Sequence, residues 1–270
     1  MTLPETRTLL LKEERGVLHV TLNRPESRNA LSAEMLAELE SVFTAIAENR
    51  EIRAVVLRGA GGTFCAGADL KNMLGSAMKP PQPGEPDPLV AINRSFGAML
   101  RKVSDIGQVL IVVCEGAALA GGMGLVCVSD IAFAHVDTKF GVPETTRGLP
   151  PAQIAPFLVE RIGLTQMRRL ALTGAQFRGA EAQRLGLVHE TFGSEEELQG
   201  KLGETLQQVL GCAPDANALT KRILLKVGKL DMDAVLDDAA QKFAACVRGP
   251  EAPEGISAFM QKRRPRWAGG

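Results

Sequence analysis

Two short stretches of small residues could aim backbone N–H groups at a bound anion. They are FCAGAD (64–69) and ALAGGMG (118–124), and each follows an apolar run typical of a buried strand. An N–H at the start of a following helix points outward without a partner, and the helix dipole favours negative charge there. If the two turns are neighbours, two N–H groups could stabilise one oxyanion. The alternative is that Ala and Gly only allow close packing of helix and strand.

Glu144 is a candidate acid and base because of its neighbours in the sequence. It follows a proline, and Phe140, Val142 and Leu149 surround it. A carboxyl group held among apolar side chains keeps its proton to higher pH than usual, so it could accept and donate a proton near neutrality. An ordinary solvated or capping glutamate is the alternative.

The elements that must position these residues are strands and helices in alternation. Residues 16–22 alternate and are rich in β-branched types, which predicts a strand that ends near Pro25. Ser32 is a candidate N-cap for a helix with apolar residues at helical spacing, namely Leu36, Leu39, Val42, Phe43 and Ile46. Residues 53–60 form an almost wholly apolar strand, typical of a sheet buried on both faces.

The same arrangement recurs further along the chain. A strand at 109–114 leads to the second small-residue turn, a helix start and a strand near 131–135, which indicates βαβ units. From about residue 155 the chain is predicted to be mostly helical, with three amphipathic stretches over 193–263. Residues 74–90 carry five Pro and two Gly and are predicted to be irregular, as a linker or as a lid over a site.

Composition excludes several classes of protein. The 270 residues include 31 Lys plus Arg and 31 Asp plus Glu, so a general nucleic-acid or anionic-membrane surface is not indicated. The sequence KRRPRW (262–267) is a local basic patch. The five cysteines form no CxxC pair and the three histidines are far apart, so neither a disulfide framework nor a metal site is predicted. No signal peptide or membrane span is indicated, and we expect a cytoplasmic protein.

Six motifs in order carry a resemblance to a known family. They are LNRPESRNAL (22–31), VVLRGAGGTFCAGADLK (55–71), EGAALAGGMGLVCVSDIAFA (115–134), FGVPETTRGLPP (140–151), RRLALTGAQFRGAEAQRLGLV (168–188) and GISAFMQKRRPRW (255–267). With them the chain resembles the enoyl-CoA hydratase/isomerase (crotonase) superfamily. The resemblance implies an α/β fold with a repeated ββα core over 1–195. It also implies a C-terminal helical region over 196–270 that forms homotrimers, often paired into hexamers.

The resemblance also implies an activity and the residues for it. The family binds an acyl-CoA thioester and stabilises an enolate with two N–H groups, which here fall on Ala68 and Gly121. No cofactor is implied, since coenzyme A is part of the substrate. The family's CoA-binding positions fall on Arg24, Arg28, Ala66, Asp69 and Leu70, with Phe259 and Lys262 from the tail.

One position departs from the pattern of the family. Two-glutamate hydratases have one carboxylate in the PE segment, here Glu144, and another at the position that Gly124 occupies. Glu144 is then the sole catalytic acid and base. We expect Gly124 to leave room for a carboxylate on the substrate, and Arg147 either pairs with that carboxylate or faces solvent. The tract PAQIAPF (151–157) resembles hydratases of methylglutaconyl-CoA and of isohexenylglutaconyl-CoA, the latter in terpenoid breakdown.

Three functions follow from these observations. The first is hydration of a branched 2-enoyl-CoA that bears a distal carboxylate. The second is Δ3,Δ2-enoyl-CoA isomerisation, for which one glutamate suffices because one proton moves between two carbons. The third is a relative that binds CoA or RNA without catalysis. The charge balance and Glu144 argue against the third, so we expect neither a nucleic acid nor a membrane as partner.

Overall fold

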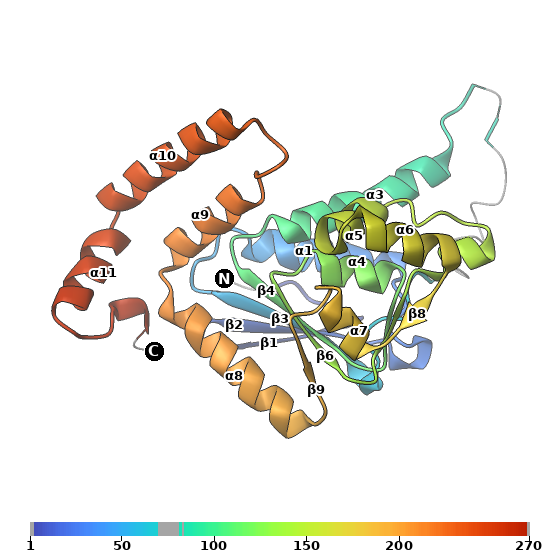
Figure 1. The fold of residues 1–270 in the computed structure, drawn as a ribbon, viewed down its shortest axis with the longest axis horizontal. Helices are drawn as coiled ribbons and strands as arrows, with labels where there is room; N and C mark the ends of the chain where they lie inside the picture. The colour runs from blue at the N-terminus through green and yellow to red at the C-terminus, as the bar shows by residue number, and fades with distance from the viewer. Residues whose placement is uncertain (1–2, 70–80, 83, 269–270) are drawn as a thin grey trace.

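A six-stranded sheet forms the centre of the molecule (Figure 1). The computed structural model describes residues 3–69, 81–82 and 84–268. In spatial order the strands are β1 (Leu9–Glu14), β2 (Val17–Leu22), β3 (Ala54–Gly59), β4 (Val109–Cys114), β6 (Ile131–His135) and β9 (Glu190–Phe192). Only the β1–β2 pair is antiparallel in this sheet. The predicted α/β class and βαβ units are confirmed.

The central sheet is buried on both faces, as the apolar run at 53–60 predicts. In β3, Val55 and Leu57 join the larger apolar cluster, which includes α1 (Ala33–Ile46). Ala54 and Val56 join a second cluster with α8 (Glu195–Gly211). Figure 1 shows α1 and α8 on opposite sides of the sheet. Successive strand residues point to opposite faces, so a strand covered on both sides is apolar throughout.

Helix α1 begins where the sequence predicts. The Ser32 hydroxyl accepts a hydrogen bond from the Met35 N–H at 3.2 Å, which satisfies one of the unpaired amides of the first turn. Four of the five expected apolar positions are buried, but Leu36 is only partly buried and Met35 is fully buried instead. The buried stripe is therefore rotated slightly from the prediction at the start of the helix.

A second, three-stranded sheet is a feature that the sequence did not reveal. Its strands are β5 (Ala117–Leu119), β7 (Lys139–Gly141) and β8 (Gln176–Phe177), in that spatial order. β5 and β7 run parallel, and β8 is antiparallel to β7. Strands of two or three residues are too short to show a periodic pattern, which is why they escape prediction.

Besides α1, the described residues form five α-helices that lie between these strands in sequence. They are α3 (Pro88–Ser104), α4 (Gly121–Cys127), α5 (Ala155–Ile162), α6 (Leu164–Thr173) and α7 (Gly179–Arg184). The start of α3 corrects the expectation that 74–90 is irregular throughout. Asp87 accepts a hydrogen bond from the Leu89 N–H at 2.9 Å, and Pro88 occupies the first helical position, where a missing N–H costs nothing.

The C-terminal part is helical, with four helices where three were expected. After α8 come α9 (Pro214–Leu224), α10 (Met232–Arg248) and α11 (Glu251–Met260). Figure 1 shows α10 and α11 extending away from the sheets. The division into a core and a region for trimer formation stays a prediction. Within the described part of the chain, no helix has both the length and the apolar character to span a bilayer.

Candidate active site

One row of residues, Cys65, Ala118 and Phe140, aligns the three segments that carry the candidate site. Cys65 forms a parallel bridge with Ala118. Ala118 in turn pairs in parallel with Phe140 in the β5–β7 register. Because the three segments run in the same direction, they leave the row on the same side. The residues three or four positions further along are Ala68, Gly121 and Glu144.

The two small-residue turns pack directly against each other. A side chain on Gly67 would begin 2.9 Å from Ala120 Cβ, and one on Gly122 would begin 2.7 Å from the Cys65 carbonyl oxygen. Neither contact is tolerable, so close packing is one reason for the small residues. The same packing brings the two backbones together, which the oxyanion interpretation also needs. The two explanations are therefore compatible.

The Ala68 N–H points away from the neighbouring segment at Leu31. Leu31 bridges to Ala68 by donating to the Gly67 carbonyl at 2.8 Å and accepting from the Asp69 N–H at 3.0 Å. In a parallel bridge of this kind, the central residue on the second strand directs its own N–H away from the first. Within the described part of the chain, the Ala68 N–H makes no hydrogen bond. It is available to a ligand.

The Gly121 amide lies at the first position of α4. N–H groups of a first helical turn have no partner within the helix, so this donor points out of the helix. The preceding residue, Ala120, has a φ of 49°, which L side chains rarely adopt. Its own N–H donates to the Gly141 carbonyl at 3.0 Å. The bond to β7 thus fixes a strained residue directly before the candidate donor.

Glu144 lies in a short 3-10 helix, Pro143–Arg147, just after β7. Its Oε2 atom is buried and, among the described residues, has no hydrogen-bond partner. Burial raises the pKa of the Glu144 carboxyl above its ordinary value, while a backbone hydrogen bond and the charge of Arg147 act in the opposite direction. The direction agrees with the sequence prediction. A half-buried carboxyl with an unused oxygen can exchange a proton with a bound molecule.

The space over Gly124 is filled. A side chain at this position would begin 2.7 Å from Ile154 Cγ2 and 3.1 Å from Leu100 Cδ1. Ile154 and Leu100 are both buried. This contact gives no support to the expectation that Gly124 leaves room for a substrate carboxylate, which stays a prediction. Apolar side chains of the protein itself occupy this place.

A model of one protein family matches almost the whole chain. The family is described as enoyl-CoA hydratase/isomerase, and the match covers residues 12–270. The chain belongs to this family. The resemblance seen in the six motifs is confirmed, as is the prediction of an enzyme of the enoyl-CoA hydratase type.

Three relatives illustrate the breadth of this enoyl-CoA hydratase/isomerase family. The chain is 52% identical to a Marinobacter aquaeolei enoyl-CoA hydratase/isomerase of known crystal structure, with a TM-score of 0.93 over 97% of this chain and 99% of that one. It is 30% identical to the Escherichia coli 2,3-dehydroadipyl-CoA hydratase, over 97% of this chain and 98% of the relative. It is also 30% identical to a peroxisomal Delta(3,5)-Delta(2,4)-dienoyl-CoA isomerase of Arabidopsis thaliana, over 99% of each.

Four of the predicted CoA-binding residues of this family member lie near one another. Arg24 forms an ion pair with Asp69 at 3.1 Å and donates to the Ala30 carbonyl at 2.7 Å. The Ala66 N–H donates to the Arg28 carbonyl at 3.0 Å. Arg28 is exposed, and no partner for its side chain is found within the described part of the chain. Arg28 is therefore the better candidate for a phosphate, because Arg24 is already engaged.

Phe259 and Lys262, predicted to bind CoA from the tail, do not join this group. Leu70 lies outside the described residues. Phe259, on α11, is 85% exposed, and Lys262 follows the helix with a φ of 55°. Figure 1 shows α11 well apart from α3 and α4. Within one chain, the tail residues are thus separated from the two turns.

Asn29 is a residue of the site region that the sequence analysis missed. Its side chain is fully buried and accepts from the Arg24 N–H at 2.8 Å. It donates to the carbonyls of Ala60 and Thr63, at 2.9 Å and 2.6 Å. Three segments around the FCAGAD turn are thereby held together. Asn29 has a φ of 54°, which asparagine tolerates better than most residues. The asparagine in the motif LNRPESRNAL is therefore the signal by which the sequence could have indicated it.

The basic tail patch is engaged in contacts within the chain. Arg263 pairs with both carboxylate oxygens of Glu254, at 2.7 Å and 3.0 Å, and the pKa of Glu254 falls to about 2 as a result. Trp267 donates to the Gly211 carbonyl of α8 at 3.1 Å. Arg263 and Trp267 of the motif KRRPRW thus fix this segment against α11 and α8.

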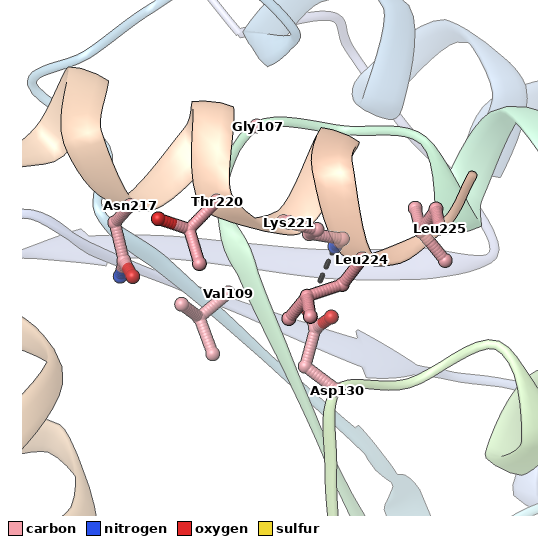
Figure 2. A pocket seen from close by; sticks show the side chains of 8 residues that line it. All are labelled: Gly107, Val109, Asp130, Asn217, Thr220, Lys221, Leu224 and Leu225. Carbon is pink, nitrogen blue, oxygen red and sulfur yellow. Dashed lines mark hydrogen bonds and ion pairs between the residues drawn. The ribbon is translucent and has the colours of Figure 1, made fainter. Parts of the chain in front are cut away.

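A hollow of about 200 Å³ lies under α9, away from the candidate site (Figure 2). In it, Lys221 Nζ and Asp130 Oδ2 are 2.7 Å apart. Asp130 also accepts from the Leu110 N–H at 2.7 Å. Leu110 and Asp130 lie at the amino ends of β4 and β6, whereas the candidate site follows the carboxyl ends of β5 and β7. The ion pair anchors α9 to the sheet.

Proposed function

We propose that this enzyme hydrates a branched 2-enoyl-CoA that bears a distal carboxylate, of the isohexenylglutaconyl-CoA or 3-methylglutaconyl-CoA type. One observation carries the proposal. The aligned row leads to two amides that have no partner among the described residues and to one half-buried carboxyl, all on the same side of three neighbouring segments. The substrate class rests on the PAQIAPF tract and on the lack of a carboxylate at position 124. That a relative is a 2,3-dehydroadipyl-CoA hydratase gives further support, since an adipyl group also ends in a carboxylate.

The mechanism uses the backbone for the oxyanion and one side chain for the protons. The N–H groups of Ala68 and Gly121 hold the thioester oxygen. The Glu144 carboxylate takes a proton from water while the water oxygen bonds to C3 and electrons move to the thioester oxygen. The enolate then takes the proton from Glu144 at C2, so water is added and Glu144 is regenerated. No cofactor takes part in this scheme.

The apolar side chains around Gly124 support the proposal that Glu144 is the only carboxylate of the protein that exchanges protons with the acyl group. Ile154 and Leu100 exclude water and charge from that side. A distal carboxylate on the substrate would then lie elsewhere. Arg147 is a candidate for it, because this residue is exposed and close enough to lower the Glu144 pKa. This interpretation is an alternative to the expectation that Gly124 leaves room for the carboxylate.

Turnover of a panel of enoyl-CoAs in ¹⁸O-labelled water tests the proposal. The panel contains crotonyl-CoA, methylglutaconyl-CoA and a longer terpenoid-branched homologue. Hydration incorporates solvent oxygen, with loss of the enoyl absorbance, and we expect the carboxylated substrates to react fastest. Lack of oxygen incorporation with every member of the panel would refute the proposal.

Isomerisation is the second candidate function. One carboxyl suffices to move a proton between two carbons, and a relative of almost the same length is a dienoyl-CoA isomerase. The same experiment discriminates, because a double-bond shift proceeds without uptake of solvent oxygen. Binding without catalysis is the least favoured function, because the charges of the chain balance and Glu144 is present. Two of the four basic tail residues, Arg263 and Arg266, also pair with Glu254.

We further propose that the enzyme assembles as a homotrimer or hexamer. Large apolar side chains are exposed along the C-terminal helices, including Leu236, Phe243, Ile256, Phe259 and Met260. Exposed apolar area of this extent favours burial against another subunit. Assembly would also allow Phe259 and Lys262 to reach the CoA site of a neighbour. A cytoplasmic location remains a prediction.

A further inference from the structure

Phe96 of α3 lies over the candidate oxyanion donor at Gly121. A side chain on Gly121 would begin 3.1 Å from Phe96 Cζ and 3.4 Å from Phe96 Cε1. The N and Cβ atoms of one residue are about 2.5 Å apart, so the edge of the Phe96 ring lies at most about 5.6 Å from the Gly121 nitrogen. An oxygen bound to this N–H is about 2.9 Å from it. The thioester oxygen is therefore at most about 8.5 Å from the edge of the ring, a gap that the first carbons of an acyl group can bridge.

Phe96 differs in exposure from the other groups at this place. Leu31 Cδ1 also lies 3.0 Å from the position of a Gly121 side chain, but Leu31 is buried. Leu100, one turn further along α3, is fully buried as well. Phe96 is only partly buried. It is thus the large apolar group in this set with a surface left for a ligand.

Contacts on both sides of Phe96 hold this part of α3 in place. Leu100 packs at Gly124, one helical turn deeper. On the outer side, Gln153 Nε2 donates to Asn93 Oδ1 at 2.9 Å. Helix residues three and four apart share a face, so these contacts and Phe96 lie on the same side of α3. A ring on a helix held in this way can accept or exclude an acyl group according to its shape.

We propose that Phe96 determines which acyl groups the enzyme accepts, by contact with the carbons next to the thioester. The inference rests on the proposed function, because it takes Gly121 as an oxyanion donor. A branch at C3 must fit beside the ring, whereas an unbranched chain need not. One methylene group in an apolar pocket changes selectivity about 10- to 200-fold, so a whole ring is a strong determinant.

The test measures binding of saturated acyl-CoA thioesters by calorimetry, so that it does not depend on turnover. The probes are butyryl-CoA and a longer 3-methyl-branched acyl-CoA, and the readout is the ratio of their dissociation constants. We expect Phe96→Ala to shift the ratio about tenfold or more towards the branched probe, and Phe96→Trp to shift it in the opposite direction. Phe96→Leu should be intermediate, and it serves if the alanine variant does not fold.

Val103→Ala is the matched control. Val103 is fully buried on α3, two turns after Phe96, and touches neither Gly121 nor Gly124, so its loss loosens the same face of the helix without removing the ring. The ratio should then stay within about threefold of the parent value. An equal ratio in all Phe96 variants, or the same shift in Val103→Ala, would overturn the inference. A Phe96-dependent ratio without hydration of any enoyl-CoA would overturn only the proposed function. Lack of binding of either probe to the parent enzyme would overturn both.

Discussion

Ile154 Cγ2 lies 2.7 Å from the point where a side chain on Gly124 would begin. The two residues are 30 positions apart, yet each limits what the other can be. A glutamate at 124 needs a smaller residue at 154, and a large residue at 154 requires glycine at 124. The lack of a second carboxylate in this enzyme is thus linked to the PAQIAPF tract by contact.

The first prediction concerns this pair. Gly124→Glu should lower the free energy of unfolding by about 1–3 kcal/mol or more, because the core is overpacked. Ile154→Ala should cost about 2–5 kcal/mol through the cavity it leaves. In the double variant the new side chain fills the cavity, so the two losses should not add. Urea unfolding measures all three, and fully additive losses would contradict the prediction.

Activity of the double variant extends this prediction. Gly124→Glu/Ile154→Ala should gain turnover on crotonyl-CoA relative to Gly124→Gln/Ile154→Ala, which has the same shape without a carboxylate. Gly124→Glu alone should lose turnover on every substrate. A gain by the single variant would show that Ile154 does not close this position.

The second prediction concerns the Ala68 amide. Ala68→Pro removes the N–H, and we expect turnover to fall ~10²–10³-fold, the usual cost of one oxyanion donor. Ala68→Gly keeps the N–H and should retain most activity. Ala66→Pro, in contrast, removes a structural hydrogen bond to Arg28 and should lower the melting temperature. Full turnover in a folded Ala68→Pro variant would exclude this donor.

The third prediction concerns Glu144 as sole acid and base. Glu144→Gln should reduce turnover ~10²–10⁴-fold, because an amide cannot relay the proton. Binding of a saturated acyl-CoA should survive, since the two amides remain. Glu160→Gln changes an exposed glutamate on α5 and should have no effect. Unchanged turnover of Glu144→Gln would show that a group other than Glu144 transfers the catalytic proton.

The fourth prediction is the pH dependence that follows from burial of Glu144. Its pKa is raised from 4.5, and hydration needs the ionised form, so activity should fall on the acid side at a pH above 4.5. The charge of Arg147 lowers this pKa, so Arg147→Gln should move the acid limb to higher pH. A pH–rate profile of both enzymes measures the shift. A limb that stays in place, or moves to lower pH, would be inconsistent with this coupling.

The ionisation of Glu144 should also change the stability of the fold, and the sign of this change follows from the raised pKa. A carboxyl whose pKa is raised by folding favours the folded state when protonated, and this contribution is lost as pH rises through the folded pKa. Glu144→Gln should therefore raise the melting temperature relative to the parent at neutral pH, and by less at acid pH. Thermal melts at several pH values provide the measurement.

The fifth prediction concerns assembly. Phe259 is 85% exposed on α11, so Phe259→Asp should leave the fold of the chain intact while it prevents burial against a neighbour. Light scattering should give a trimer or hexamer for the parent and a smaller species for the variant. Leu10→Asp on β1, 55% exposed at the other end of the chain, is the control. A parent enzyme that is monomeric would refute the proposed assembly.

The sequence predicts much of the fold because long apolar strands and capped helices leave local signals. Ser32, the apolar run of β3 and the alternation of strand and helix are of this kind. The two turns and Glu144 are also recognisable, because small residues and an apolar neighbourhood are local features. That Cys65, Ala118 and Phe140 form one row is not local, since it depends on strands of two or three residues. The closure of position 124 by Ile154 is a contact across the fold, which no pattern in one segment reveals.

The docking of Trp267 on α8 gives the protein a single optical reporter. The chain has one tryptophan and no tyrosine, so its intrinsic fluorescence comes almost entirely from this indole. The indole N–H donates to the Gly211 carbonyl, and its ring lies 3.1 Å from the position of a side chain on Gly255 of α11. The emission therefore reports whether the tail is seated between α8 and α11, without any label. If the proposed assembly dissociates on dilution and the tail is released, the wavelength of maximum emission would change before the sheet unfolds.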